Sequence, residues 1–452
     1  MSSERDTIAA IATPAGRGAI ALIRLSGEEA LTIGRSVFRP SGGSSESVKP
    51  RVATFGSVVS KDDEPIDEVL FTWFKAPRSY TGEDLVEISC HGGILVTKAI
   101  LARLLEAGAR AAAGGEFTQR AFLNGKMDLT QAEAVMDVIS AQTDLALRSA
   151  NEQLQGYLGE EVERLRKELI GVIAHLEAFI DFPDEDIDPD TGKGLASRIR
   201  EIEVAIAKLT ATSEQGRILR EGVRTVIAGA PNVGKSSLLN LLLGFERAIV
   251  SEVAGTTRDT IEEVISLEGI PLRLIDTAGV RDAEDVVEKE GISRAIAQVS
   301  DAELVLQVFD GSIAPGAEKD ALSIAGAQKV VTILNKTDLG EHTKWSHTEA
   351  IRLSCTNREG LEALTARIVD TLSGDTADWG GHAIAINARH QACLQTSASY
   401  LDIAGKKLSE GEAPEFVAIE LRSALNSIGE IIGKTDIEEI LGEIFGAFCI
   451  GK

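Results

Sequence analysis

Apolar and polar positions in the first part of the chain follow two different periods, which predicts a mixed domain. Four apolar or alternating runs are typical of strands: TIAAIAT, GAIALIRLS, EVLFTWF and DLVEISC. A fifth run, Ile94–Ala107, has the spacing of a helix. The polar segment 40–50, PSGGSSESVKP, is typical of a loop. We therefore expect residues 1–118 to form a compact α+β domain.

From about residue 119 the pattern becomes that of amphipathic helices. Apolar residues between Leu165 and Ile180 recur at 3.6-residue spacing, and a second helical run extends from Leu195 to Leu219. Helical spacing resumes at Ala388 and continues to the C-terminus. The predicted boundaries are 119–220 and 376–452 for two helical parts, with another domain at 221–375. Helices on both sides predict that this middle domain is inserted into one helical domain.

The middle domain contains a complete phosphate-binding loop. Residues 229–236 read GAPNVGKS, between a strand-like run VRTVIA and a helix-like run SLLNLLLG, which is the context that the pattern requires. Its backbone N–H groups and the helix N-terminus suit a polyphosphate. Lys235 would place a charge at the β- and γ-phosphates, and the Ser236 hydroxyl would bind Mg²⁺. The predicted contacts are Asn232, Val233, Gly234, Lys235, Ser236 and Ser237.

A second motif identifies the base as guanine. Asn335-Lys336-Thr337-Asp338 follows the apolar run VVTIL, about 100 residues after the phosphate loop. The Asp338 carboxylate can accept from guanine N1–H and N2–H₂, whereas adenine offers no such pair of donors. Asn335 would contact the other edge of the base, and the Lys336 stem would cover its ring. We expect the segment 354–356, with Ser354 and Cys355, to offer backbone N–H groups to guanine O6.

Two further elements complete a guanine-nucleotide switch domain. The segment 276–279, DTAG, follows the strand-like run PLRLI, and the segment 255–259, GTTRD, precedes IEEVISL. We expect Asp276 to approach Mg²⁺ through water, Gly279 to donate its N–H to the γ-phosphate, and Thr257 to supply a second Mg²⁺ hydroxyl. Thr277 and Ala278 belong to the same predicted GTP-binding segment.

Position 280, which follows DTAG, is Val rather than the Gln that orients water in many regulatory GTPases. Valine cannot hydrogen-bond the attacking water, so another group must do so. The following stretch offers five carboxylates, most of which we expect to be solvated and one of which we expect to handle the water. They are Asp282, Glu284, Asp285, Glu288 and Glu290.

Composition restricts the remaining choices. The chain has 452 residues and a net charge of −24, so it repels nucleic acid at long range and needs a local basic patch or a basic partner to hold RNA. No apolar run approaches a membrane span, and the start MSSERDTIAA lacks the layout of a signal peptide. The four cysteines show no metal-binding or disulfide pattern. We expect a cytoplasmic protein without a membrane partner.

The chain ends on Cys449-Ile450-Gly451-Lys452, after the apolar residues IFGAF. A prenylation box is disfavoured, because such boxes favour other last residues. An apolar run of this kind would be poorly soluble if it were loose. We therefore expect the tail to dock on the protein and to have a function.

Several segments together make the chain resemble the MnmE (TrmE) family of tRNA-modification GTPases. They are TPAGRGAIALIRLSG, YTGEDLVEISCHGG, GEFTQRAFLNGKMDLTQAEAV, FIDFPDED, LREGVRTVIAGAPNVGKSSLLN, GTTRD, DTAGVR and the terminal FCIGK. The GTPase motifs occur widely, whereas the N-terminal motifs and the ending are specific to this family. The resemblance covers the whole chain.

The resemblance implies a particular reaction and particular partners. A family member is expected to work with the FAD protein MnmG in a heterotetramer. Together they would add an aminomethyl or carboxymethylaminomethyl group to C5 of the wobble uridine of certain tRNAs. The one-carbon donor would be 5,10-methylene- or formyl-tetrahydrofolate. The resemblance also implies a homodimer through the N-terminal domains, with GTP, Mg²⁺ and K⁺ at the GTPase domains.

The resemblance also assigns residues. Folate contacts fall on Arg24, Glu87, Lys126 and Lys452, where a carboxylate suits the amino-pyrimidine edge of the pterin and cations suit the folate glutamate. The water-orienting acid falls on Glu288, and Cys449 matches a functional cysteine of the family. The K⁺ site falls on four positions: Asn232, Ser251, Val253 and Thr256.

Two other classes of function share the GTPase motifs. A ribosome-assembly or RNA-chaperone GTPase would carry a basic RNA-binding domain or a second GTPase domain, and the acidity of this chain disfavours that class. A pure signalling switch would not need the N-terminal charged residues. Tetrahydrofolate binding by the N-terminal domain would distinguish the leading hypothesis from both.

Overall fold

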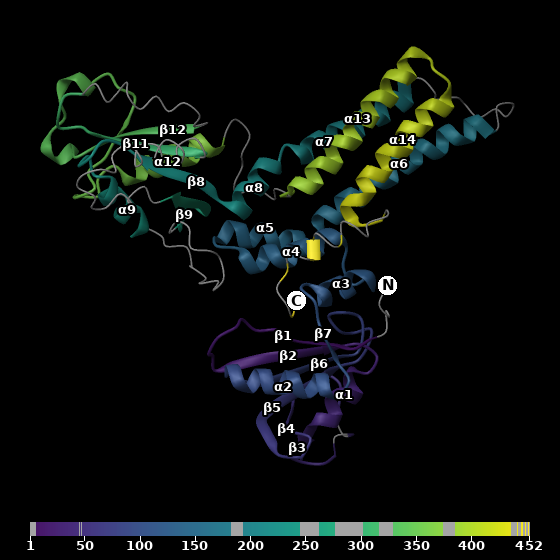
Figure 1. Ribbon diagram of the computed structural model, residues 1–452. Helices are drawn as coiled ribbons and strands as arrows, with labels where there is room; N and C mark the ends of the chain where they lie inside the picture. The colour runs from purple at the N-terminus through teal and green to yellow at the C-terminus, as the bar shows by residue number, and fades with distance from the viewer. Residues whose placement is uncertain are drawn as a thin grey trace, which may run out of the picture. The chain divides into compact units, whose positions relative to one another are not determined.

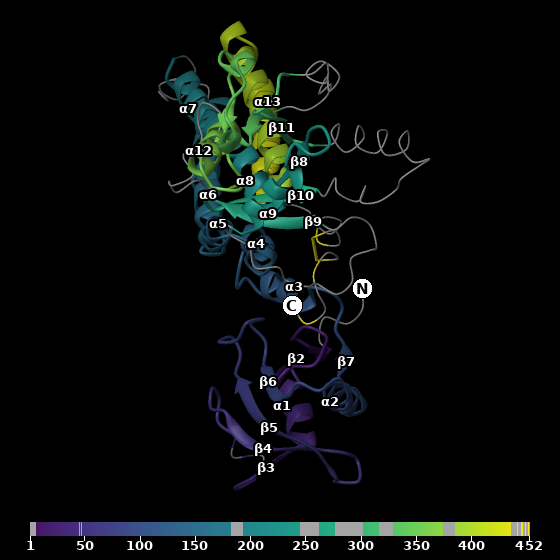
Figure 2. The same ribbon diagram turned by 90° about the vertical axis from the view of Figure 1, so that its left-hand side faces the viewer.

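The computed structural model describes residues 6–44, 46, 48–181, 193–244, 262–275, 302–315, 329–373 and 385–434, together with 441, 444, 445, 448 and 451. Figures 1 and 2 show the chain in two views at right angles. It divides into two compact units, one of residues 1–136, 159–166 and 425–452, the other of residues 137–158 and 167–424. Within the described ranges, no helix is long and apolar enough to cross a membrane.

A seven-stranded sheet forms the N-terminal part of the first unit. Its order is β3-β4-β5-β6-β2-β1-β7, with antiparallel neighbours except for the parallel pair β1 and β7. The register sets Arg24 of β2 opposite Glu87 of β6. The strands are β1 Ile8–Ile11, β2 Ile20–Ser26, β3 Phe38–Pro40, β4 Thr54–Val59, β5 Pro65–Phe74, β6 Leu85–His91 and β7 Arg110–Ala111.

Helices α1 (Ala30–Val37) and α2 (Ile94–Glu106) share one core with this sheet, in which Ile23, Phe71 and Ile100 are fully buried. All four predicted strands and the predicted helix are confirmed. Helix α1 and strand β4 were not predicted. Helix α1 has only eight residues, and Gly56 and Ser57 interrupt the apolar spacing of β4, so neither pattern stands out in the sequence.

The first unit also contains α3 (Glu116–Leu123), the start of α4 (Leu129–Ser140) and parts of the C-terminal tail. Asp128 caps α4, because its carboxylate accepts from the Gln131 backbone N–H at 2.9 Å. Phe445 and Phe448 of the tail pack with Leu129 of α4 in a buried cluster. The predicted docking of the tail is therefore confirmed for the described residues. The domain boundary predicted after residue 118 falls within α3.

Helices from both sides of the middle domain pack together in the second unit. Helix α7 (Lys193–Thr210) lies against α13 (Ala388–Glu410), as Figure 1 shows. An ion pair of 2.6 Å joins Glu177 of α6 (Tyr157–Asp181) to Arg422 of α14 (Pro414–Ile432). The predicted insertion is therefore confirmed. The remaining helices before the insertion are α5 (Asp144–Leu154) and α8 (Ser213–Glu221).

The inserted domain contains a six-stranded sheet in the order β13-β12-β11-β8-β10-β9. All neighbours are parallel except β9 and β10. The carboxyl ends of parallel strands share one edge, so the residues after β8 and β12 meet there. The strands are β8 Val223–Ala228, β9 Glu262–Leu267, β10 Ile270–Ile275, β11 Leu304–Asp310, β12 Lys329–Asn335 and β13 Ile351–Arg352, and the helices are α9 Lys235–Leu243, η3 Thr337–Leu339, η4 Thr343–Trp345 and α12 Leu361–Ser373.

Candidate functional site

The phosphate loop turns from β8 into α9 through two residues with left-handed backbones. Asn232 has φ 64° and Gly234 has φ 102°. Asparagine tolerates this conformation better than most side chains. Gly234 needs its missing side chain for a second reason, because a Cβ there would collide with Nδ2 of Asn335. The glycine pattern of the motif thus fits both the turn and the close approach of the neighbouring strand end.

Lys235, the first residue of α9, lies back across the loop. Its Nζ donates to the carbonyl oxygens of Gly229 at 2.9 Å and Ala230 at 2.8 Å. Burial lowers the pKa of this ammonium group. The structure therefore holds the Lys235 charge inside the loop that is predicted to receive phosphates.

Asn335, at the end of β12, joins the phosphate loop to the segment after β13. Its Nδ2 donates to the Val233 carbonyl at 2.9 Å, and its Oδ1 accepts from the Cys355 N–H at 3.2 Å. The residue is only 2% exposed. The predicted contact to the base stays a prediction, and the amide nitrogen carries a second hydrogen for it. The linking role was not predicted.

Asp338 is held by its neighbour in space, Ser354, whose Oγ donates to Asp338 Oδ1 at 2.7 Å. This contact orients the carboxylate that is predicted to recognise guanine. The Ser354 backbone N–H donates to Glu359 at 3.0 Å, so it already has a partner, as does that of Cys355. Their predicted contact to guanine O6 is not tested by this arrangement. Burial, and then the nearby Asp338, raise the pKa of the Cys355 thiol to about 11.

Lys336 has a partner that sequence reasoning missed. Its Nζ lies 2.7 Å from Asp310 Oδ2, at the end of the adjacent strand β11. Burial of Asp310 acts to raise its pKa, but hydrogen bonds from Lys336 and Ser312 outweigh burial and leave the pKa lowered. The sequence contained a signal for this ion pair. Asp310 ends the apolar run LVLQVF, and the NKTD motif follows another apolar run, so both lie at the edge where parallel strands end.

The structure thus brings predicted GTP-site residues of the phosphate loop close to those at the end of β12 and after β13. They are Val233, Gly234, Lys235, Asn335, Asp338, Ser354 and Cys355. Asn232 and the two hydroxyl residues Ser236 and Ser237 are exposed on the same loop and helix start. The other predicted residues of this site lie outside the described residues: Ser251, Val253, Thr256, Thr257, Asp276, Thr277, Ala278, Gly279 and Glu288. In the part of the chain that is described, no cluster of three or more His, Cys, Asp or Glu is placed to hold a metal ion.

The predicted folate residues of the first unit also lie close together. Arg24 Nε and Glu87 Oε1 are 2.8 Å apart on neighbouring strands, with their side chains 19% and 22% exposed. The Arg24 guanidinium lies 5.5 Å from the ring centroid of Tyr80, in the loop 75–84 between β5 and β6. Lys126 Nζ donates to the carbonyl of Pro77, in the same loop, at 3.0 Å. One loop therefore connects all three predicted residues.

The C-terminal tail reaches the same sheet. Gly451 packs so closely on the end of β1 that a Cβ would come within 2.8 Å of the Ala12 Cα, and its φ of 99° also favours glycine. Cys449 and Lys452, the two tail residues with predicted roles, lie outside the described residues. The approach of Gly451 to Ala12 nevertheless brings the two ends of the chain together in one unit.

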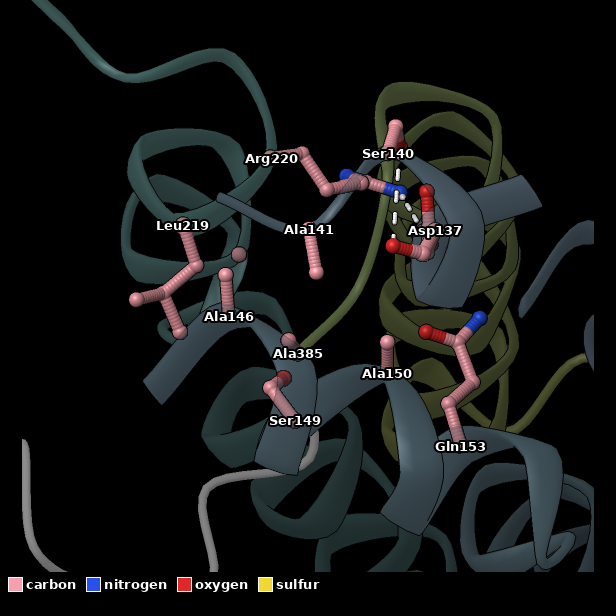
Figure 3. A pocket seen from close by; sticks show the side chains of 11 residues that line it. Asp137, Ser140, Ala141, Ala146, Ser149, Ala150, Gln153, Leu219, Arg220 and Ala385 are labelled. Carbon is pink, nitrogen blue, oxygen red and sulfur yellow. Dashed lines mark hydrogen bonds and ion pairs between the residues drawn. The ribbon is translucent and has the colours of Figure 1, made fainter. Parts of the chain in front are cut away.

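A small cavity of about 20 Å³ lies between α4, α5, α8 and Ala385 in the second unit (Figure 3). Arg220, just before the phosphate-loop strand, lies at its edge. Its Nη2 donates to the Ile386 carbonyl at 3.0 Å, and its Nη1 lies 3.7 Å from Asp137. Arg220 therefore joins the chain that enters the inserted domain to the chain that leaves it. The cavity holds about one water molecule, so it is not a substrate pocket.

Two known families match the sequence. Residues 7–126 match the family described as GTP-binding protein TrmE N-terminus, and residues 129–449 match the family described as MnmE helical domain. The chain is 51% identical over 453 residues to the tRNA modification GTPase MnmE of Akkermansia muciniphila, with 100% of both chains covered. It is 45% identical to the protein of the same name from Geobacter sulfurreducens, with 99% of both covered. Among solved structures, the G domain of the FeoB iron transporter of T. maritima is 28% identical over 32% of this chain and 96% of that chain, with a TM-score of 0.26.

Proposed function

The chain belongs to the MnmE family of tRNA-modification GTPases, and on that basis we propose that it builds a modified wobble uridine in the cytoplasm. The chain is a GTPase that acts in tRNA modification. The proposal adds the reaction that the chain takes part in. With an FAD-containing partner of the MnmG type, the chain attaches an aminomethyl or carboxymethylaminomethyl group to C5 of the wobble uridine. Tetrahydrofolate, as a 5,10-methylene or formyl derivative, carries the one-carbon unit.

One observation supports the folate assignment more than any other: the loop 75–84 connects Arg24, Glu87 and Lys126. The Arg24–Glu87 pair offers adjacent donor and acceptor groups, which suit the amino-pyrimidine edge of a pterin. Lys126 is a cation that contacts Pro77 of the same loop, and its charge suits the folate glutamate. Lys452 would add a second cation from the tail. A homodimer through the N-terminal domains remains part of the proposal.

For the GTP site, the proposal assigns a role to each residue of the guanine-nucleotide motifs. Lys235 neutralises charge on the β- and γ-phosphates, Asp338 recognises guanine, and Ser236 and Thr257 would hold Mg²⁺. Asn232, with Ser251, Val253 and Thr256, would hold K⁺ beside the phosphates, where it would neutralise charge that develops in the transition state. Glu288 would orient the attacking water, because Val280 cannot.

Reconstitution tests the proposal directly. The full chain, the FAD partner, unmodified tRNA, GTP and methylene-tetrahydrofolate are combined, and digested nucleosides are analysed by mass spectrometry. We expect mass to be gained at the wobble uridine only when all five components and an amine source are present. Modification that proceeds equally well without any folate would remove the donor assignment, while leaving the GTPase assignment intact.

A further inference from the structure

The loop 75–84 owes its conformation to contacts with other elements. The hydroxyl groups of Ser26 on β2 and Thr81 on the loop are fully buried and 2.6 Å apart. Ser26 Oγ also donates to Glu83 Oε2 at 2.7 Å. These contacts fix the middle of the loop to the sheet, close to Tyr80, which lies over Arg24.

Helix α3 and the turn after it hold the loop from the other side. Thr118 Oγ1 is 2.8 Å from the Tyr80 hydroxyl, and Asn124 Nδ2 donates to the Thr81 carbonyl at 2.8 Å. The Lys126 contact to Pro77 continues this row of contacts. The loop is thus held between β2 and α3, and each side supplies several hydrogen bonds.

Arg120 is the charged centre of this arrangement. Its Nη1 donates to the backbone carbonyl of Asp6 at 2.8 Å and to both Glu83 carboxylate oxygens at 3.3 Å. Its Nη2 donates to Asp6 Oδ1 at 2.7 Å and to Glu116 Oε1 at 3.0 Å. The side chain is only 11% exposed. Arg120 therefore ties the loop, through Glu83, to the start of the chain and to α3.

We propose that Arg120 is a positioning residue for the tetrahydrofolate site, acting through Glu83 to hold the loop 75–84 over the Arg24–Glu87 pair. This inference rests on the proposed function, because it concerns the same site. Glu83 without Arg120 would be a half-buried carboxylate with Ser26 as its remaining side-chain partner, which favours a loop that leaves the sheet. Ligand binding would then have to restore the order of the loop. The free energy needed for this ordering would weaken the observed affinity.

Arg110 provides a matched control within the same network. Its guanidinium contacts Asp6 at 2.6 Å and Glu116 at 2.6 Å, two of the three acidic residues that contact Arg120. Its hydrogen bonds go to those two residues and to the Ala111 carbonyl, and none goes to the loop 75–84. Loss of Arg110 therefore disturbs the network and leaves the loop contact in place.

The test measures binding of 5-formyl-tetrahydrofolate to the full-length protein by isothermal titration calorimetry. Four variants are compared with the wild type: Arg120→Ala, Arg120→Lys, Glu83→Gln and Arg110→Ala. We expect Arg120→Ala to weaken binding about tenfold or more, and Arg110→Ala to change it by no more than about twofold. Arg120→Lys, which keeps the charge, should recover part of the loss. Thermal unfolding followed by circular dichroism reports whether each variant is folded, because all of the substituted residues belong to the first unit and the GTPase domain to the second.

A double-mutant cycle separates positioning from general stability. If Arg120 acts through Glu83, the combination Arg120→Ala with Glu83→Gln should weaken binding little more than either change alone. The inference would be overturned if Arg120→Ala and Arg110→Ala weakened binding equally, or if the effects in the cycle were fully additive. The folate site itself would still be supported in that case, because the wild type binds the ligand. If Arg120→Ala does not fold, Glu83→Gln alone decides, because unchanged affinity in that variant would also overturn it. No binding by the wild type would remove the folate assignment itself, and the inference with it.

Discussion

Asp338 and Ser354 show how single residues prepare the nucleotide site. The Ser354 hydroxyl holds one carboxylate oxygen of Asp338 at 2.7 Å, so the carboxylate is oriented by the protein itself. An oriented acceptor contributes more to discrimination between bases than a mobile one, because little order has to be gained on binding.

We expect Asp338→Asn to weaken GTP binding by roughly 100-fold or more, because an amide places a donor where guanine also presents donors. Xanthosine triphosphate, which has an acceptor at that position, should bind the variant better than GTP does. Fluorescence titration with labelled nucleotides measures both affinities. If GTP bound to the variant as tightly as to the wild type, the assignment of the NKTD motif would be wrong.

A second residue-scale prediction concerns the water that attacks GTP. Glu288→Ala should lower the hydrolysis rate by roughly 10²-fold, the effect of removing a positioned general base. Nucleotide affinity should change little, because the group acts mainly in the transition state. Single-turnover hydrolysis gives the rate, and Glu290→Ala is the matched control. A normal rate for Glu288→Ala, with a slow Asp285→Ala or Glu284→Ala variant, would move the role to another acid.

At the scale of elements, strand β7, helix α3 and the residues just before β1 are joined by the ionic network of Asp6, Arg110, Glu116 and Arg120. A hydrogen bond from Arg110 is the largest cause that lowers the pKa of Asp6 from its usual 3.8. For Glu116, burial acts to raise the pKa, but hydrogen bonds, that from Arg110 first, outweigh it and leave the pKa lowered. Both carboxylates are therefore more acidic in the folded than in the unfolded chain.

This sign predicts the response of the first unit to acid. A carboxylate with a lowered folded pKa stabilises the fold above its unfolded pKa, and the contribution is lost as the pH falls through the folded pKa. The melting temperature of the wild type should therefore decrease below about pH 4. The melting temperature of the Asp6→Asn variant should decrease less steeply with falling pH, because one of the two carboxylates is absent. Thermal unfolding followed by circular dichroism between pH 7 and 3 measures this. Parallel curves for the variant and the wild type would contradict the prediction.

Features with local patterns could be predicted from the sequence, whereas contacts between distant residues could not. Strands β1, β2, β5 and β6 were predictable because their apolar spacing is local. The meeting of the phosphate loop with Asn335 followed from parallel strand ends sharing an edge. The partners of Arg120 were not predictable, since Asp6 is 114 residues away and Glu83 is 37 residues away along the chain. A surface arginine and this partly buried one look alike in the sequence.

In the whole molecule, the proposed folate site takes residues from both ends of the chain. Phe445 and Phe448 are buried against α4, and Gly451 packs on the end of β1. These contacts hold the tail in the unit that contains Arg24, Glu87 and Lys126. Burial of two phenylalanines stabilises this docking by about 3–6 kcal/mol before the entropy of ordering the tail is subtracted.

Deletion of residues 449–452 should therefore separate the two activities. Tetrahydrofolate-dependent modification should be lost, because Cys449 and Lys452 are removed. GTP hydrolysis should be unchanged, because the predicted GTP contacts all lie between residues 232 and 355. Parallel assays of phosphate release and tRNA modification measure the two activities. A Lys452→Gln variant, which keeps the length of the tail, tests the charge alone. Loss of both activities on deletion would indicate a folding defect and contradict a local role.

We propose that this chain modifies wobble uridine in a GTP-dependent reaction, and nucleoside analysis in cells tests this proposal. Wobble nucleosides are isolated from a strain that lacks the gene and are analysed by mass spectrometry, with and without a plasmid that carries the wild-type chain. We expect the C5 substituent to be absent from the deletion strain, restored by the wild type and not restored by Asp338→Asn. An unchanged nucleoside profile in the deletion strain would show that the chain is not required for wobble-uridine modification.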